Sequence, residues 1–397
     1  MGHKFLFIAN NNIGFGLSGG DTIFIQLLIN WQSSNTISLL ACQEAIDILP
    51  PSVNKVKILS TDSINPRSNN SLINLLFHYI RRLHRVFVFI FKNKSLLSGH
   101  DYVYSVSDFL PDLLPALYLK LTQPQLRWIA GYYLFAPHPF SSQTPYRGIR
   151  RLKGFVYWFI QLFTRFLVDK FADYIFITST PDASRFSKSK HIITIRGGVD
   201  LYDINNYIKN HPPKPVSRRP YDACFLGRFH PQKGCLILIK IWRSLVDKHP
   251  QARLALIGQG EEEGTMRQMI QKYNLQNNID IYSFLVGSPK YKIFADSKIV
   301  VHPAIYDSGG MASAEALAFG LPGVSFDLQS LKTYYPSGFL KTKCFSISKF
   351  ADNIHLLLSD QKVYNQLSRQ AKKLVKNNWD WTKRSQEIYS QVTYNQL

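Results

Sequence analysis

Cysteine is scarce in this 397-residue chain, and its four cysteines form no pattern typical of a disulfide scaffold or a zinc site. They are Cys42, Cys224, Cys235 and Cys344, and no two of them make a C-x-x-C pair. Disulfide scaffolds are short secreted chains with dense cysteines, and zinc sites need closely spaced ligands. The sequence therefore predicts a protein of a reducing compartment with no metal site.

Acidic residues are also few relative to basic ones. The chain has 26 Asp and Glu against 47 Lys and Arg, which gives a net charge of +21. Such an excess indicates an anionic partner, which could be nucleic acid, acidic lipid or a phosphorylated ligand. The positive charge is clustered, so a merely soluble basic surface explains it less well.

No apolar run reaches the roughly 18 residues that would predict a membrane span. Two stretches, 72–97 and 146–170, instead mix Lys and Arg with aromatic and aliphatic residues at helical spacing. This pattern is typical of helices that lie in an anionic membrane surface, although a core helix with a basic solvent face would also show it. Because two such stretches occur before residue 171, we favour membrane contact.

Strand-like and helix-like segments alternate through the chain, which predicts α/β architecture with mostly parallel sheets covered by helices on both faces. The N-terminal run KFLFIAN lacks a signal-peptide cleavage pattern and reads as the first strand. Residues 201–220 contain four prolines and little apolar periodicity, so they are the expected linker. We expect an N-terminal domain at 1–200, a C-terminal domain at 221–376 and a final helix at 377–397.

Candidate phosphate-binding residues follow the first strand of the second domain. Gly227 and Arg228 come directly after the strand YDACFL, and Lys233 follows within the same loop. Ligands of open α/β domains bind at the carboxyl ends of strands, and Arg and Lys are the side chains that hold phosphate. The next strand is followed by Gly258 and Gly260, which predict a tight turn.

A second candidate region is HPAIYDSGGMASAEALAFGLP at 302–322. Its Ser308, Gly309 and Gly310 precede a helix, whose free amides favour an anion. Glu315 lies about one turn further along, where its carboxylate could accept hydrogen bonds from ribose hydroxyls. Asp307, in the loop before the helix, would then serve a different part of the same ligand.

Together these residues resemble glycosyltransferase family 4, whose members are retaining enzymes of the GT-B fold. The resemblance is carried by the acid-x7-glutamate pattern of Asp307 and EALAFGLP, and by the G-R-x5-K-G pattern at 227–234. Three weaker elements are the glycine loop GFGLSGGD, the GGVD at 197–200 and the W-x-W at 379–381. Their order along the chain makes the resemblance specific.

The resemblance implies two Rossmann-like domains facing a cleft, a C-terminal helix returning to the first domain, and a metal-independent hexosyltransferase without a cofactor. It implies that Asp307, Arg228 and Lys233 take part in catalysis. The implied donor-binding residues are Gly227, Arg228, Lys233, Gly258, Gly260, Ser308, Gly309, Gly310, Met311 and Glu315. The implied residues near the diphosphate and acceptor are Gly16, Gly19, Gly20, Tyr132, Tyr133 and His138.

The chain departs from the family pattern at three places. The first acid is Asp307 where glutamate is usual, and Ser308-Gly309-Gly310 replaces the usual G-F-G. The first-domain histidine of the family is replaced by Tyr132 or Tyr133, with His138 a few residues on.

We therefore expect a retaining glycosyltransferase that acts from the cytosolic face of the membrane. Its donor would be a UDP-, GDP- or ADP-linked sugar, and its acceptor a lipid-linked or other membrane-associated glycan. The location would be cytoplasmic, peripheral on the inner membrane face. Two alternatives are a catalytically weak or inactive GT-B partner subunit and a basic nucleic-acid-binding protein, for which no standard motif is present.

Overall fold

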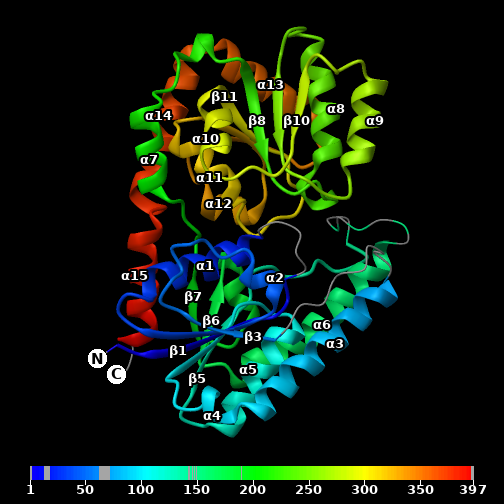
Figure 1. Ribbon diagram of the computed structural model, residues 1–397. Helices are drawn as coiled ribbons and strands as arrows, with labels where there is room; N and C mark the ends of the chain where they lie inside the picture. Colours follow the sequence, from blue (N-terminus) through cyan, green and yellow to red (C-terminus); the bar gives the residue numbers. More distant parts are fainter. Residues whose placement is uncertain are drawn as a thin grey trace. The chain divides into compact units, whose positions relative to one another are not determined.

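The computed structural model describes residues 2–12, 18–61, 72–141, 144, 146, 148, 150–188 and 190–394, which form two compact units. Unit 1 contains Met1–Ser141, Tyr146–Ile195 and Ser385–Leu397, and unit 2 contains Ser142–Pro145 and Arg196–Arg384. Each unit is built on one parallel sheet (Figure 1). Within these described ranges, no helix has both the length and the apolar composition needed to cross a bilayer.

The sheet of unit 1 has the strand order β3-β2-β1-β4-β5-β6-β7. Its strands are β1 (Lys4–Ala9), β2 (Thr36–Ala41), β3 (Lys57–Ser60), β4 (Tyr102–Ser105), β5 (Arg127–Gly131), β6 (Tyr174–Ile177) and β7 (His191–Thr194). The central strands are apolar on both faces because helices cover both, which explains why β1 is buried at five consecutive residues.

The helices of unit 1 lie between these parallel strands in the chain. They are α1 (Gly19–Trp31), α2 (Gln43–Ile46), α3 (Leu72–Lys92), α4 (Lys94–Leu97), α5 (Leu110–Thr122) and α6 (Arg150–Phe171), with the 3-10 helix η1 at Thr180–Arg185. Figure 1 shows α3, α5 and α6 on one side of the sheet. Phe109, at the start of α5, contacts Tyr79 of α3 and Tyr157 of α6, with ring centroids 6.0 and 5.5 Å away.

The two stretches that read as basic membrane helices thus form α3 and α6, which lie next to α5. One of the basic residues is not at the surface, because Arg82 of α3 is buried. Its Nη2 lies 2.9 Å from Glu44 Oε1, and its Nη1 donates to the backbone oxygen of Asn10 at 2.6 Å. The sequence pattern did not reveal this partner, which comes from α2.

The sheet of unit 2 has the order β10-β9-β8-β11-β12-β13. Its strands are β8 (Tyr221–Leu226), β9 (Leu254–Ile257), β10 (Ile279–Tyr282), β11 (Ser297–His302), β12 (Gly323–Phe326) and β13 (Phe339–Thr342). Alternate residues of β8 enter different apolar cores: Ala223 and Phe225 pack on one face, and Cys224 packs on the other. Both faces of this sheet are therefore covered, as expected of a parallel sheet.

The helices of unit 2 include one, α7, within the segment 201–220 that the sequence predicts to be a linker. They are α7 (Leu201–Asn210), α8 (Cys235–Val246), α9 (Glu263–Lys272), α10 (Ser288–Ala295), α11 (Met311–Ala318), α12 (Gln329–Tyr334), α13 (Ile347–Ser359) and α14 (Gln361–Asn378), with 3-10 turns η2 (Val216–Arg218) and η3 (Pro231–Lys233). Half of the expected linker 201–220 is α7, whose Ile204 is fully buried in unit 2. The four prolines all lie after the end of α7, so none of them interrupts this helix.

The last helix, α15 (Trp381–Thr393), begins in unit 2, and its residues from Ser385 onward are part of unit 1. In unit 1, Trp31 Nε1 donates to the backbone oxygen of Ser385 at 3.0 Å, and the Trp31 and Tyr389 rings are 5.5 Å apart. In unit 2, Trp379 stacks on Tyr335 at 5.3 Å. The two tryptophans of the W-x-W element thus belong to the packing of unit 2.

Candidate functional site

Two loops that follow the neighbouring strands β8 and β11 meet at the carboxyl edge of the unit 2 sheet. The strand order reverses here, because β9 and β10 lie on one side of this pair and β12 and β13 on the other. Such a switch point opens a crevice in parallel sheets. The backbone N–H of Ile305 donates to the oxygen of Gln232 at 3.0 Å, which ties the two loops together.

Gly234 allows the loop after β8 to approach β11. Its φ is +70°, in the left-handed region, and a Cβ atom there would lie 2.1 Å from the backbone oxygen of Pro303. Only glycine satisfies both conditions without a shift of the backbone. The preceding residue, Lys233, is therefore carried to the start of the loop that follows β11.

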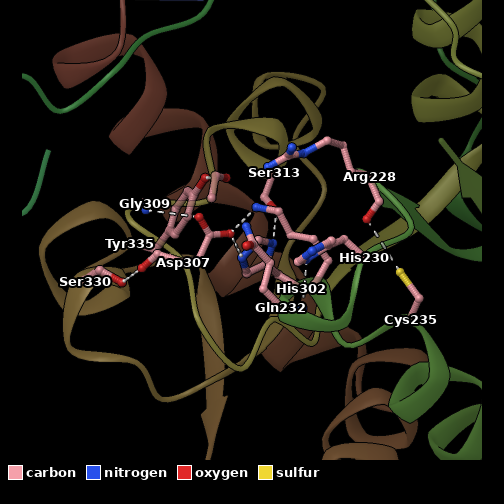
Figure 2. A network of polar contacts seen from close by, with 12 residues as sticks. Arg228, His230, Gln232, Cys235, His302, Asp307, Gly309, Ser313, Ser330 and Tyr335 are labelled. Atoms are coloured by element: carbon pink, nitrogen blue, oxygen red, sulfur yellow. Dashed lines mark hydrogen bonds and ion pairs between the residues drawn. The ribbon is translucent and has the colours of Figure 1, made fainter. Parts of the chain in front are cut away.

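Asp307 is the centre of an ionic cluster (Figure 2). Lys233 Nζ donates to its Oδ2 at 2.6 Å, and His302 Nε2 lies 3.1 Å from the same oxygen. The backbone N–H of Gly309 points to Oδ1 at 3.4 Å, and the hydroxyl of Ser330 donates to the backbone oxygen of Asp307 at 2.6 Å. The Asp307 side chain is only 6% exposed, so solvent does little to weaken these charges.

Burial by itself would raise the pKa of Asp307. The Lys233 ammonium and the His302 imidazole more than compensate and hold the pKa of this carboxyl well below its ordinary value. Asp307 is therefore ionised throughout the physiological pH range. Because its carboxylate neutralises Lys233, an incoming anion would compete with Asp307 for that lysine.

The start of α11 faces the same cluster. Gly310 is the N-cap residue with φ +60°, and a Cβ atom there would lie 2.7 Å from His302 Nε2. The hydroxyl of Tyr335 donates to the backbone oxygen of Gly310, and Ser313 Oγ lies 3.1 Å from His302 Nδ1. The first turn of α11, beginning at Met311, thus starts beside the His302 side chain of this cluster, and helix N-termini have free amides that a phosphate could accept from.

Glu315 lies further along α11 and has a cationic partner of its own. Lys290 Nζ, from α10, is 2.8 Å from Glu315 Oε1 and 2.7 Å from Oε2. Both side chains are largely buried, and the same ammonium lies 5.4 Å from the centre of the Tyr291 ring. This contact fixes the carboxylate in one orientation and leaves its other lone pairs for hydroxyl donors.

The glycines after β8 and β9 bring a third loop to this edge. The N–H of Gly227 donates to Ile257 oxygen at 3.0 Å, and the N–H of Phe229 donates to Gln259 oxygen at 2.9 Å. Gly258 and Gly260 lie against the backbone of Gly227 and Phe229, respectively. The Arg228 side chain is exposed beside these loops.

The structure therefore brings Lys233, Asp307 and Ser308–Met311 together, with Glu315 on the same helix. Sequence reasoning missed His302 and Lys290. His302 ends the strand that leads to Asp307, and that position was a signal for it. Lys290 had no signal, because it lies on a different helix 25 residues before Glu315.

The site residues expected in unit 1 separate into different environments. Gly16 lies outside the described residues. Gly19 and Gly20 open α1 behind its N-cap Ser18, and a Cβ atom on Gly20 would lie 3.3 Å from the Tyr133 ring. The hydroxyl of Tyr133 hydrogen-bonds that of Tyr104, so Tyr133 lies between the glycine turn and β4.

Tyr132 and His138 contact α6, whereas Tyr133 lies beside the glycine turn. Tyr132 is fully buried, and its hydroxyl donates to the backbone oxygen of Gln161 in α6 at 3.1 Å. The exposed His138 ring packs on Trp158 of α6, 5.1 Å away. Successive residues of an extended segment point to opposite sides, so Tyr132 and Tyr133 could not both face the glycine turn. The expectation that Tyr132 contacts a ligand there is corrected.

Comparisons with known proteins show that part of the chain is similar to glycosyltransferases. Residues 207–374 match the family model of Glycosyl transferases group 1. An uncharacterized glycosyltransferase of Methanocaldococcus jannaschii is 28% identical over 171 residues, which span 41% of either chain. The poly(glycerol-phosphate) alpha-glucosyltransferase of Bacillus subtilis is 25% identical over 40% of this chain and 24% of its own. The chain thus spans less than half the length of these curated relatives.

Similarity of fold covers more of the chain than similarity of sequence does. HepE of Anabaena, solved in complex with UDP and glucose, superposes with a TM-score of 0.71 at 15% identity, over 98% of this chain and 99% of that one. The chain is therefore similar to the glycosyl transferases of group 1 over the segment that holds the Lys233–Asp307 cluster, and it has the GT-B fold of two parallel α/β units.

Proposed function

We propose that this protein is a retaining glycosyltransferase that transfers a sugar from a nucleotide-sugar to a lipid-linked or other membrane-associated glycan. The observation that carries the proposal is the cluster of Lys233, Asp307 and His302 at the start of α11, with Glu315 on the same helix. In the proposal, the cluster receives the phosphate and the Glu315 carboxylate accepts hydrogen bonds from hydroxyls. A nucleoside diphosphate sugar presents both groups.

In the proposed reaction, the bond between the anomeric carbon and the diphosphate oxygen breaks, and the electron pair leaves with the diphosphate. Lys233, Arg228 and the first amides of α11 stabilise the negative charge that develops on that oxygen. An acceptor hydroxyl attacks the anomeric carbon from the face that the diphosphate leaves, and its proton passes to the diphosphate or to solvent. The proposal uses no metal in this step, in keeping with the family resemblance.

The proposed donor roles are supported by what related folds bind. Glu315 would accept hydrogen bonds from ribose hydroxyls, with Lys290 holding the carboxylate in place. HepE, which shares the fold, was solved with UDP and with UDP-glucose. UDP-sugars are therefore the first donors to test, before GDP- and ADP-sugars.

The membrane part of the proposal depends on α6. A set of large apolar side chains on this helix faces outward, at spacings of three and four residues. We name this set the α6 stripe; its members are Leu152, Phe155, Phe159, Leu162, Phe163 and Phe166. Surface helices of globular proteins normally turn the apolar face inward, so the α6 stripe indicates an apolar partner outside the chain. Exposed Lys170 lies at its C-terminal end, as in helices that lie in an anionic bilayer surface.

The donor site is tested by thermal unfolding with a panel of UDP-, GDP- and ADP-sugars. We expect one nucleotide class to raise the melting temperature by mass action. Glu315→Gln should weaken its binding about tenfold or more, because the charged acceptor of the ribose hydroxyls is lost. Lys240→Ala, which removes an exposed lysine of α8, is the control and should bind as the wild type does. No stabilisation by any nucleotide would refute the proposal.

Transfer is tested with radiolabelled donor and membrane lipid extract. Nucleotide binding without transfer or donor hydrolysis would favour the alternative of an inactive partner subunit, which the hydrogen-bonded tyrosine pair at Tyr133 motivates. Binding to DNA at physiological salt, with none to anionic vesicles, would favour the nucleic-acid alternative.

A further inference from the structure

A polar pocket lies in unit 1 beside the α6 stripe. Trp158, Leu162 and Arg165 of α6 line one side of it at helical spacing. Arg185 of η1 and the aromatic rings of Tyr132 and Phe135 line the rest. Two guanidinium groups and no carboxylate are among its lining residues. Two carboxylates contact the lining from outside: Asp108 accepts from Gln161 at 2.7 Å, and Asp182 accepts from Arg185 at 3.0 Å.

Arg165 is available for a ligand. Among the described residues it has no ion pair and donates no side-chain hydrogen bond, although it is only half-exposed at the pocket wall. A half-buried arginine normally has an acidic partner, because desolvation of the charge is costly. The pocket therefore holds an unused fork of N–H donors, which is the geometry that binds a phosphate through two oxygens.

Arg185 is held in place on the other side. Its Cζ lies 4.6 Å from the centre of the Phe135 ring, and its Nε donates to Asp182 at 3.0 Å, which leaves the terminal nitrogens uncommitted. Arg165, Arg185 and the Tyr132 ring all line the pocket. Burial and the Asp108 carboxylate raise the pKa of the Tyr132 hydroxyl, and the charges of the two arginines oppose that shift. The two guanidinium groups thus face one pocket.

The rim of the pocket is apolar on the outward side. Leu162 lines the pocket and also belongs to the α6 stripe, whose Phe159, Phe163 and Phe166 are 61%, 53% and 60% exposed. From Leu152 to Phe166 the stripe extends about 21 Å along the helix. A ligand that fills the pocket would therefore carry an anionic group for the arginines and apolar chains for the stripe.

We propose that this pocket binds the phosphate of an anionic phospholipid headgroup while the α6 stripe enters the lipid layer. A bilayer supplies both groups next to each other, because headgroup phosphates lie directly above the acyl chains. The inference depends on the membrane contact in the proposed function but not on sugar transfer in unit 2.

The first test titrates the full-length protein with dihexanoyl-phosphatidylglycerol below its micelle concentration. Arg165→Ala should weaken binding roughly tenfold, since a bidentate charge-assisted contact is lost. Arg165→Lys should recover only part of the affinity, because lysine keeps the charge and lacks the fork. Arg151→Ala removes the same charge from the same helix outside the pocket, and it should change binding by less than about twofold.

Comparison ligands separate the possible sources of the phosphate. Inorganic phosphate should bind much more weakly than the short-chain lipid, because it lacks the chains that contact the stripe. Equal affinity for inorganic phosphate would overturn the lipid assignment, and so would equal losses in Arg165→Ala and Arg151→Ala. Arg185→Ala provides a second variant if Arg165→Ala does not fold.

The second test measures flotation with phosphatidylglycerol-containing vesicles. The double variant Phe159→Ser/Phe163→Ser should lose vesicle binding, and Arg165→Ala should lose more of it than Arg151→Ala. Vesicle binding that is unchanged in all of these variants would overturn the proposal. Nucleotide-induced stabilisation, measured on the same samples, should stay at the wild-type level, so failure of the donor site and failure of the lipid pocket give different results.

Discussion

The sheets of unit 1 and unit 2 share the order of their first six strands, and in each unit an aspartate side chain is buried shortly after the fourth of these strands. In unit 1 this strand is β4, followed by Asp108 and Asp112; in unit 2 it is β11, followed by Asp307. Burial raises the pKa of Asp108 to about 6 and that of Asp112 to about 7. The pKa of Asp307 is held far below its ordinary value, so the same topological position carries opposite shifts.

The partners of each aspartate explain the difference. Asp108 accepts a hydrogen bond from the amide of Gln161 at 2.7 Å, and Asp112 accepts from the backbone of Asn10 and the hydroxyl of Ser107. The cation near Asp112 is Arg82, which is paired with Glu44. Asp307 instead contacts Lys233 directly. Unit 1 thus has a hydrogen-bonded structural cluster, whereas unit 2 has an ionic one, in which the proposed function has a phosphate compete with the Asp307 carboxylate for Lys233.

The strongest test of this contrast is Lys233→Ala. It leaves Asp307 buried without its main counter-charge, so the free energy of unfolding of unit 2 should fall by about 3–5 kcal/mol. Nucleotide-sugar binding should fall by roughly a hundredfold, since a buried charge-assisted contact to phosphate is lost. Denaturant unfolding and nucleotide titration measure the two effects.

Lys233→Ala/Asp307→Ala serves as the matched variant. It removes both charges, so most of the stability should return while nucleotide binding stays weak. A double variant no more stable than Lys233→Ala would contradict the assignment of the loss to an unpaired carboxylate.

The second test uses pH. A buried carboxyl with a raised pKa binds more protons in the folded state, so its contribution to stability is full below pH 3.8 and is lost as pH rises through about 7 for Asp112. Unit 1 should therefore lose up to about 1.4 kcal/mol per pH unit from this group within that window. Asp112→Asn should flatten the profile, as measured by hydrogen exchange of β1 and β4 peptides between pH 5 and 8.

Asp307 gives the opposite expectation for unit 2. Its lowered pKa contributes stability that is fully present above its ordinary value of 3.8 and is lost only as pH falls below that value. In proteins that both carry His302→Gln, which removes the imidazole coupled to this carboxylate, Asp307→Asn should therefore leave the slope of stability against pH unchanged between pH 5 and 8. Equal changes of slope in Asp112→Asn and Asp307→Asn would show that the two clusters do not differ in the way described.

A smaller effect is expected at the second ion pair of unit 2. Lys290→Met keeps the length of the side chain and removes the charge that holds Glu315. We expect unfolding free energy to fall by about 1 kcal/mol and nucleotide affinity to fall about threefold to tenfold. Tighter nucleotide binding would mean that Lys290 competes with the ribose, not that it positions Glu315.

The smallest effects concern the tyrosines of unit 1. Tyr132→Phe and Tyr133→Phe each remove one buried hydrogen bond, so each should cost about 1 kcal/mol of stability. Transfer should respond only to Tyr133→Phe, because Tyr133 lies against Gly20 and Tyr132 lies against α6. Equal losses of transfer rate in the two variants would contradict this separation.

The sequence by itself determined the α/β class, the parallel sheets and the residues that follow β8 and β11. These are local properties, because periodicity, glycine position and the spacing of Asp307 and Glu315 can be read within one short segment. The same local properties predict a linker over 201–220, although α7 occupies its first half. The prolines that suggest a linker all lie beyond residue 211, after the helix has ended.

The tertiary structure alone decided which charges meet. Lys290 pairs with Glu315 of another helix, and His302 and Lys233 both contact Asp307. Glu44 pairs with the buried Arg82 of α3, a helix whose sequence predicts exposed basic residues. It also decided that the apolar face of α6 points outward, which helical spacing cannot tell from an inward face. Spacing gives the period of an element, whereas its partners and its orientation depend on the elements that pack against it.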